Sequence, residues 1–209
     1  LGLEPSAVVG HSQGEIAAAV VCGALTLADG ARVVALRSRE LVSVAGRGGM
    51  AVVELPASEV QVRLEQDGTD LSVAVVNTSS STVVSGDASA IDAFEARMQS
   101  EGVFCRRVEV DYASHSAQVD PILASLAASL SEVRGQQASM PMVSTVNGAQ
   151  LEGPELVAAY WCRNLREPVR LDQALSVLQS EGHGVFVEVS AHPVLAMPLT
   201  EACAATSGV

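Results

Sequence analysis

Residues 10–15, which read GHSQGE, are the stretch around which the rest of this 209-residue sequence is organised. The apolar run Ala7 to Val9 precedes them, and residues 16–21, all small or aliphatic, follow them. The pattern predicts a strand, a tight turn and a helix, with Ser12 on the turn, where the hydroxyl of a Gly-x-Ser-x-Gly motif projects outward. The glycines at both ends of the motif leave room for the close backbone approach that such a turn needs.

Ser12 is therefore a candidate nucleophile. Because a helix begins beside it, unpaired backbone N–H groups would point at an oxyanion formed there. The alternative is a serine that caps the helix of an ordinary strand-to-helix turn.

Composition and charge exclude several classes of function. The formal net charge is −12. Because contacts to phosphates need a basic surface, no nucleic-acid partner is expected. No apolar run approaches the length of a membrane span, so no membrane partner is expected. The cysteines lack metal-ligand spacing, which predicts no metal site and a reducing, cytoplasmic compartment: Cys22, Cys105, Cys162 and Cys203.

The outer parts of the chain, residues 1–46 and 116–209, alternate strands and helices and are predicted to form a large α/β subdomain with a parallel sheet. A helix is expected over 27–44, with Thr26 as its N-cap, and a late strand over 185–189. The sequence begins only a few residues before a buried-looking strand and has no initiating Met. We expect it to be an excerpt of a longer polypeptide.

The middle of the chain, residues 47–115, has a different rhythm. Its predicted elements follow the order β-α-β-β-α-β, which is that of a small ferredoxin-like unit inserted in the larger fold. Its first helix is expected to begin with Ser58 as the cap, and its last strand to cover 103–110.

A serine nucleophile needs a base. His115 lies in the polar loop where the middle unit returns to the main sheet, and a cleft is expected at such a crossing. His192, which follows the late strand, is a rival, and a loop histidine with a solvent or backbone partner is the alternative for His115. His11 would point away from Ser12, and His183 lies between two glycines in a solvated turn.

Arg37 lies on the apolar face of the predicted helix 27–44, where its neighbours are Val33, Val34, Leu41 and Val44. A buried guanidinium is costly unless an anion pairs with it. Its planar fork would hold a substrate carboxylate. The alternative is an arginine that reaches solvent or pairs with an internal acid such as Glu40.

Together these residues resemble the acyltransferase domain of modular type I polyketide synthases. The resemblance rests on GHSQGE at 10–15, Arg37, and YASH at 112–115. The segments YWCRNLREPVR at 160–170 and EVSAHPVL at 188–195 match as well, so the resemblance covers essentially the whole chain.

The resemblance implies a fold and a set of roles. The fold is an α/β-hydrolase-like large subdomain with an inserted ferredoxin-like one, whose N-terminal part, with a Gly-Gln-Gly motif that donates to the oxyanion, is missing here. Ser12 would be the acylated nucleophile and His115 its base, oriented by a backbone carbonyl from residues 164–170. Arg37 would hold the free carboxylate of a malonyl-type unit, and the Gln13 N–H would bind the oxyanion.

The resemblance also implies a substrate. The loop sequence YASH and the Gln13 that follows the nucleophile resemble methylmalonyl-selective domains, and malonyl selectivity is the alternative. Ser114 replaces a bulky Phe and leaves room for an α-methyl branch, which is worth about 1–3 kcal/mol of discrimination. The expected substrate-binding residues are Arg37, Gln13, His11, Tyr112 and Ser114.

The implied reaction moves the acyl unit from a coenzyme A thioester to Ser12 and then to the phosphopantetheine thiol of an acyl carrier protein, with no bound cofactor. Neighbouring polyketide synthase domains are the other expected partners, and a monomer is the expected state of this piece. A serine hydrolase or thioesterase is the rival function, with an acid at Asp111 or Asp120 and a base at His183 or His192.

Overall fold

The structure, a computed structural model, describes residue 2 and residues 4–206. The chain begins with β1 (Val8–Val9), α1 (Gly14–Val21), α2 (Leu27–Leu41) and the 3₁₀ turn η1 (Val42–Val44). The middle elements are β2 (Gly48–Val53), α3 (Ala57–Asp67), β3 (Ser72–Val76), β4 (Thr82–Asp87), α4 (Ala88–Ser100) and β5 (Cys105–Arg107). The last are η2 (Ala117–Val119), α5 (Asp120–Ser129), β6 (Met142–Val143), β7 (Gln150–Leu151), α6 (Ala158–Arg166), β8 (Val169–Arg170), α7 (Leu171–Ser180) and α8 (Ala196–Thr206).

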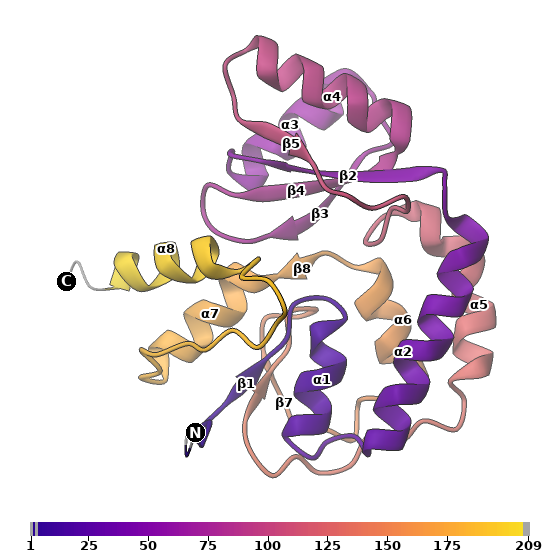
Figure 1. Ribbon diagram of the computed structural model, residues 1–209, viewed down its shortest axis with the longest axis vertical. Helices are drawn as coiled ribbons and strands as arrows, with labels where there is room; N and C mark the ends of the chain where they lie inside the picture. Colours follow the sequence, from indigo (N-terminus) through magenta and orange to yellow (C-terminus); the bar gives the residue numbers. More distant parts are fainter. Residues whose placement is uncertain (1, 3, 207–209) are drawn as a thin grey trace.

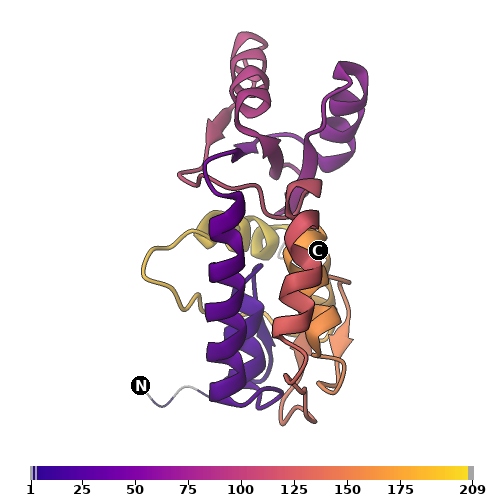
Figure 2. The same cartoon turned by 90° about the vertical axis from the view of Figure 1, so that its right-hand side faces the viewer.

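The middle elements have the predicted β-α-β-β-α-β order (Figure 1). Their four strands pair antiparallel in the order β5-β2-β4-β3, which is the ferredoxin-like arrangement. Helices α3 and α4 cover one face of this sheet (Figure 2), and the apolar cluster between them and the strands includes Val60, Leu64, Ile91, Phe94 and Met98.

A fifth strand, β8, joins this sheet from the C-terminal part of the chain. It pairs in parallel with β3, and Val169 lies opposite Val75. These residues form a small apolar cluster on the sheet face opposite to α3 and α4. The sequence does not predict β8, because two residues are too short for a periodic pattern to be recognised.

The outer parts of the chain form the second sheet and most of the helices. Strands β1 and β6 are parallel, as expected, whereas β7 pairs antiparallel to β6, so this sheet is mixed. Helices α1, α2, α5 and α6 pack around one core that includes Ile16, Leu25, Val33, Leu126 and Trp161. Figures 1 and 2 show α2 and α5 side by side along this core. Among the described residues, no helix combines the length and apolar character needed to cross a membrane.

The separate apolar clusters bear on the division of the chain. One cluster belongs to the middle elements, and another to residues from both outer parts. They support our proposal that residues 1–46 and 116–209 form one subdomain and residues 47–115 the other.

Some predicted elements differ in the structure. The strand prediction over 185–189 is wrong: Val185, Val187 and Val189 are exposed, and among the described residues no strand lies alongside to accept their hydrogen bonds. The strand expected over 103–110 is limited to β5, because its regular register with β2 covers Cys105–Arg107, beyond which one more bond runs from the Val108 N–H to the Met50 carbonyl.

The helix ends also differ in part. Thr26 caps α2 as predicted, with its side chain accepting from the Asp29 N–H, and the last turn of this helix becomes η1. Ser58 does not cap α3. Pro56 stands at the N-cap, and the helix starts one residue before Ser58.

The turn between β1 and α1 depends on Gly10. A Cβ atom added there would lie 2.2 Å from the backbone nitrogen of Glu15, whereas nothing lies within 4 Å of a Cβ added at Gly14. We therefore expect Gly10→Ala to lower the free energy of unfolding by about 2–3 kcal/mol or more, because the backbone must shift.

Gly14→Ala is the matched control, and we expect it to change stability by less than about 1 kcal/mol. Urea unfolding of both variants tests this. Equal stability of the two would show that the turn does not require the close approach at Gly10.

Candidate active site

Ser12 lies on the turn between β1 and α1, with a left-handed backbone (φ 53°). The turn is closed by the Gly14 N–H, which donates to the His11 carbonyl at 2.9 Å, and by the Glu15 N–H, which donates to the Ser12 carbonyl at 3.0 Å. Such a conformation costs on the order of 1–3 kcal/mol for a residue with a side chain, and it is retained where the surrounding structure over-determines it. The half-buried Ser12 is thereby presented at the start of α1.

His115 lies in the loop after β5 and is also left-handed (φ 60°). Two parts of the molecule hold this loop. The His115 N–H donates to the Leu165 carbonyl on α6 at 2.9 Å, and the Ser85 hydroxyl on β4 donates to the Ser114 carbonyl at 2.6 Å. His115 is only 2% exposed, so its ring has a fixed environment.

The two side chains meet across 103 positions of sequence. His115 Nε2 lies 2.8 Å from Ser12 Oγ, and His115 Nδ1 lies 2.8 Å from the Glu167 carbonyl oxygen. A carbonyl oxygen only accepts hydrogen bonds, so Nδ1 carries the proton and donates it. Nε2 then has a free lone pair and accepts from the Ser12 hydroxyl. Glu167 lies within the segment 164–170, from which the orienting carbonyl is expected.

The surroundings of His115 keep it neutral. Burial lowers its pKa to about 3, and the positive charge of Arg37 acts in the same direction. A neutral imidazole with its lone pair on a serine hydroxyl is the arrangement of a general base beside its nucleophile.

Arg37 is on α2 and is 5% exposed. Its Nη1 donates to Asn164 Oδ1 at 2.7 Å, and its Nη2 donates to Ser12 Oγ at 3.3 Å. The buried Nε has no hydrogen-bond partner among the described residues. Burial lowers the pKa of Arg37 to about 10, so the side chain stays cationic at neutral pH. Glu40, its suggested partner, instead accepts from Ser125 and lies beside Arg39.

The other expected binding residues differ in how far they are exposed. Gln13 is exposed at the N-cap of α1, and His11 is half-buried, with Asn77 beside it and a pKa lowered by burial. Ser114 is buried next to His115. Tyr112 is half-buried.

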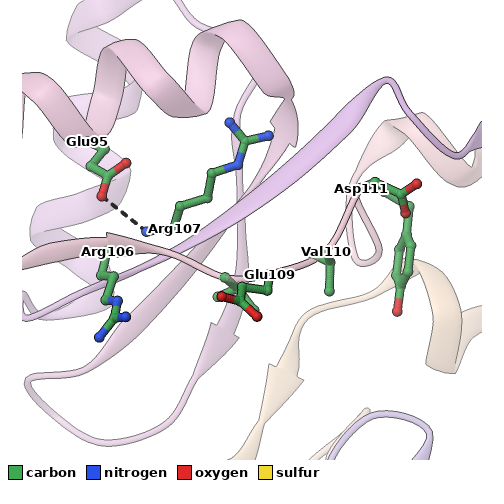
Figure 3. Close-up of a pocket in the computed structure, with 8 residues that line it drawn as sticks. Glu95, Arg106, Arg107, Glu109, Val110 and Asp111 are labelled. Atoms are coloured by element: carbon green, nitrogen blue, oxygen red, sulfur yellow. Dashed lines mark hydrogen bonds between the residues drawn. The ribbon is translucent and has the colours of Figure 1, made fainter.

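A wide cleft follows the segment from β5 to this loop. Figure 3 shows Arg106 and Glu109 in it, with the Arg107 N–H donating to Glu95. Of the expected substrate-binding residues, Tyr112 lines it, as does Asp111, so the cleft leads along the small sheet to the loop that carries His115.

The residues of the rival hydrolase arrangement do not gather at Ser12. His183 Nδ1 lies 3.2 Å from the Ser6 hydroxyl, and His192 is exposed. Asp111 is exposed, and Asp120 pairs with Arg166. Among the described residues, no three His, Cys, Asp or Glu side chains form a group that could hold a metal ion.

Sequence reasoning missed two residues of this site. Asn164 is 2% exposed and joins Arg37 to the Ser12 carbonyl, to which its Nδ2 donates at 3.1 Å. Glu15 is fully buried behind it. The sequence does carry a signal for Glu15. It is an acidic residue directly before an apolar helical run, and an acid on a buried helix face is unusual. No sequence signal pairs Asn164 with Arg37.

The whole chain, residues 1–209, matches the family model of the acyl transferase domain. It is 53% identical over 207 residues to Spectinabilin polyketide synthase system protein NorC of Streptomyces orinoci, with 99% of this chain and 9% of that protein covered. It is 46% identical over 204 residues to Erythronolide synthase EryA3 of Saccharopolyspora erythraea, with 97% and 6% covered. The chain thus spans less than a tenth of the length of either relative.

Solved structures agree with this similarity. The acyltransferase domain from module 8 of the salinomycin polyketide synthase superposes with a TM-score of 0.96 at 48% identity, covering 99% of this chain and 49% of that one. A loading acyltransferase from the avermectin modular polyketide synthase gives a TM-score of 0.94 at 40% identity, covering 100% and 66%.

The buried neutral His115 predicts a pH dependence of stability. In the unfolded chain a histidine titrates near its ordinary pKa of 6.5, whereas the folded pKa is about 3. Below pH 6.5 the unfolded state therefore binds the extra proton, and stability is lost as the pH falls. As the pH falls from about 7.5 to about 5, this residue should lower the free energy of unfolding by about 2 kcal/mol.

Urea unfolding at both pH values measures this loss in the wild type and in His115→Gln, which does not titrate. The variant should lose about 2 kcal/mol less than the wild type over the interval. An equal loss in both proteins would mean that folded His115 is not held neutral.

Proposed function

This chain belongs to the acyl transferase domain family, and from that premise we propose that it transfers an extender acyl group from coenzyme A to an acyl carrier protein in polyketide biosynthesis. The observation that carries the proposal is the 2.8 Å hydrogen bond between Ser12 Oγ and His115 Nε2. Two relatives with similar sequences are named as polyketide synthase proteins.

In the first step, His115 Nε2 accepts the proton of the Ser12 hydroxyl as Oγ attacks the thioester carbonyl of the acyl-CoA. The Glu167 carbonyl, 2.8 Å from Nδ1, stabilises the imidazolium that forms. The Gln13 N–H at the start of α1 donates to the oxyanion of the tetrahedral intermediate. The carbon–sulfur bond then breaks, the proton passes from His115 to the sulfur, and coenzyme A leaves an acyl-Ser12 ester.

In the second step, the phosphopantetheine thiol of the carrier protein takes the place of coenzyme A. His115 accepts the thiol proton, the sulfur attacks the ester carbonyl, and the carbon–oxygen bond to Ser12 breaks. His115 returns the proton to Ser12 Oγ, which restores the free enzyme. The acyl group is thus exchanged between two thioesters, and the reaction needs no redox step.

Arg37 binds the free carboxylate of the extender unit. Its position supports this role in two ways. It is buried against Ser12, and it has an N–H group, on Nε, that lacks a partner among the described residues. A planar guanidinium matches a carboxylate, so an acyl group that carries one is bound in preference to acetyl or propionyl.

Methylmalonyl-CoA is the extender that we propose. Ser114, next to His115, is a small side chain in a buried position of the active-site loop, and we infer that it leaves room for an α-methyl branch. With Tyr112, Gln13 and His11 it would form the remaining substrate contacts. The acyl-CoA substrate and the carrier protein imply a cytoplasmic reaction within a larger synthase.

An intact-mass experiment tests this function in the full-length natural protein. Incubation with an equimolar mixture of methylmalonyl-CoA and malonyl-CoA should give a methylmalonyl adduct, because Ser12 forms a stable ester. Ser12→Ala should form none.

The outcomes separate the alternatives. A malonyl adduct would keep the transferase and overturn the choice of extender. Release of free acid through Ser12 without transfer to a carrier protein would favour a hydrolase.

The extender choice has its own test. We expect Ser114→Phe to lower the ratio of kcat/KM for methylmalonyl-CoA over malonyl-CoA by about 10- to 200-fold, because the ring fills the space of the methyl group. Ser114→Ala keeps that space and should leave the ratio within about threefold of the wild type. A ratio unchanged by Phe would show that residue 114 does not face the α-substituent.

A further inference from the structure

Glu15 is a carboxylate with no exposed surface, at the start of α1 and three residues after Ser12. Four donor groups lie within hydrogen-bond distance of it. Oε1 accepts from the Thr145 N–H and lies 3.0 Å from the Thr145 hydroxyl, whose single proton is shared with the Gly10 carbonyl at 2.9 Å. Oε2 accepts from the Tyr160 hydroxyl at 2.9 Å and from Asn164 Nδ2 at 2.7 Å. Burial raises the pKa of Glu15, and the bonds from Thr145, Tyr160 and Asn164 oppose that rise by favouring the charged form.

Asn164 connects Glu15 to the active site. Its Nδ2 donates both to Glu15 and, at 3.1 Å, to the Ser12 carbonyl, while its Oδ1 accepts from Arg37 Nη1 at 2.7 Å. Each end of the amide therefore faces groups of the opposite polarity. The Ser12 carbonyl, which only accepts, and Arg37, which only donates, favour this orientation, and the Nδ2 group keeps its second hydrogen bond in it only if Glu15 presents an acceptor.

One group in this chain of contacts has a hydrogen-bonding role that cannot change, and it decides the roles of the others. The Thr145 backbone N–H is always a donor, so the atom of residue 15 that faces it must accept. A carboxylate also accepts at its other oxygen, whereas an amide in its place would donate there. Only the carboxylate can therefore accept from Thr145 and from Asn164 at the same time.

We propose that Glu15 is a positioning residue for the extender carboxylate: as an acceptor at both ends, it fixes the orientation of the Asn164 amide, which in turn holds the Arg37 guanidinium beside Ser12. The inference rests on the proposed function, because it gives a reason for the fixed geometry of Arg37. The negative charge of Glu15 also lies close enough to Arg37 to favour its cationic form.

Glu15→Gln tests this chain of contacts while keeping the size of the side chain. The amide oxygen must face the Thr145 N–H, so the NH₂ group faces Asn164 Nδ2, donor against donor. Asn164 then either loses this bond or turns over, which presents its NH₂ group to Arg37 Nη1 and its oxygen to the Ser12 carbonyl. In the first case the amide that holds Arg37 is less firmly fixed, and in the second Arg37 loses its acceptor.

The readout is the ratio of kcat/KM for methylmalonyl-CoA over propionyl-CoA, with pantetheine as the acceptor and the full-length natural protein as the enzyme. These substrates differ only in the carboxylate. We expect Glu15→Gln to lower the ratio by about 10- to 100-fold, mainly through a higher KM for methylmalonyl-CoA. The constants for propionyl-CoA should change less than those for methylmalonyl-CoA, because propionyl-CoA has no carboxylate for Arg37 to bind.

Tyr160→Phe is the matched control for a merely structural role. It removes one of the hydrogen bonds to Glu15 and the contact with the Ser144 hydroxyl at 2.7 Å, but it leaves the facing atoms of Glu15 and Asn164 unchanged. This variant should be destabilised in thermal unfolding and keep the wild-type ratio. A fall in the ratio as large as that of Glu15→Gln would overturn the proposal, as would an unchanged ratio in Glu15→Gln.

A rescue variant keeps the test informative if Glu15→Gln folds poorly. In the double variant Glu15→Gln with Asn164→Asp, the carboxylate introduced at position 164 accepts from the amide introduced at position 15 and from Arg37, but it no longer donates to the Ser12 carbonyl. The matched reference is Asn164→Asp alone, which shares that loss and sets two carboxylates against each other, so the ratio of the double variant should exceed that of Asn164→Asp. A ratio no higher than that of Asn164→Asp would count against the polarity argument.

Failure of the proposed function is distinguishable in the same assay. If the wild type lacks a preference for methylmalonyl-CoA, or if Arg37→Ala keeps that preference, then Arg37 does not read the carboxylate. The Glu15→Gln result tests the role of Glu15 once Arg37→Ala has been shown to abolish the preference for methylmalonyl-CoA.

Discussion

A single hydrogen bond, between Ser12 and His115, sets the geometry that the surrounding structure has to maintain. Both residues have left-handed backbones, a conformation that residues with side chains avoid. Ser12 is retained within its own turn, where Gly10 allows the close backbone approach to Glu15, and His115 is retained by a contact outside its turn, because its N–H donates to the Leu165 carbonyl. The fold thus supplies the free energy that keeps both residues in unfavourable backbone conformations. Their side-chain atoms, Ser12 Oγ and His115 Nε2, then lie 2.8 Å apart.

The small sheet takes part in the active site although Ser12 lies outside it. Ser85 on β4 holds the carbonyl of Ser114, next to His115. On the other side of the ring, the Glu167 carbonyl precedes β8, which pairs with β3 of the same sheet. His115 is therefore fixed from its own backbone and from its Nδ1 partner by one rigid sheet. This explains how a histidine oriented by a carbonyl, rather than by an acid, keeps a defined ring orientation.

The buried charged groups of the site influence one another's charge states. Arg37 is cationic beside Ser12, where its charge would stabilise the substrate carboxylate that we propose it binds. The same charge, with burial, keeps His115 neutral and able to accept a proton. Glu15 balances Arg37 through Asn164 without a direct ion pair. The guanidinium is thus held beside Ser12 through Asn164.

The local features of this protein could be predicted from its sequence: the strand, turn and helix around Ser12, the order of the middle elements, the Thr26 cap, and Arg37 on an apolar helical face. These depend on periodicity and turn chemistry within a few residues. The three-dimensional arrangement was needed to establish which histidine meets Ser12, that the orienting carbonyl belongs to Glu167, and that 185–189 is not a strand. Such outcomes depend on hydrogen-bond partners far away in the sequence, and a local pattern carries no information about which distant group supplies them.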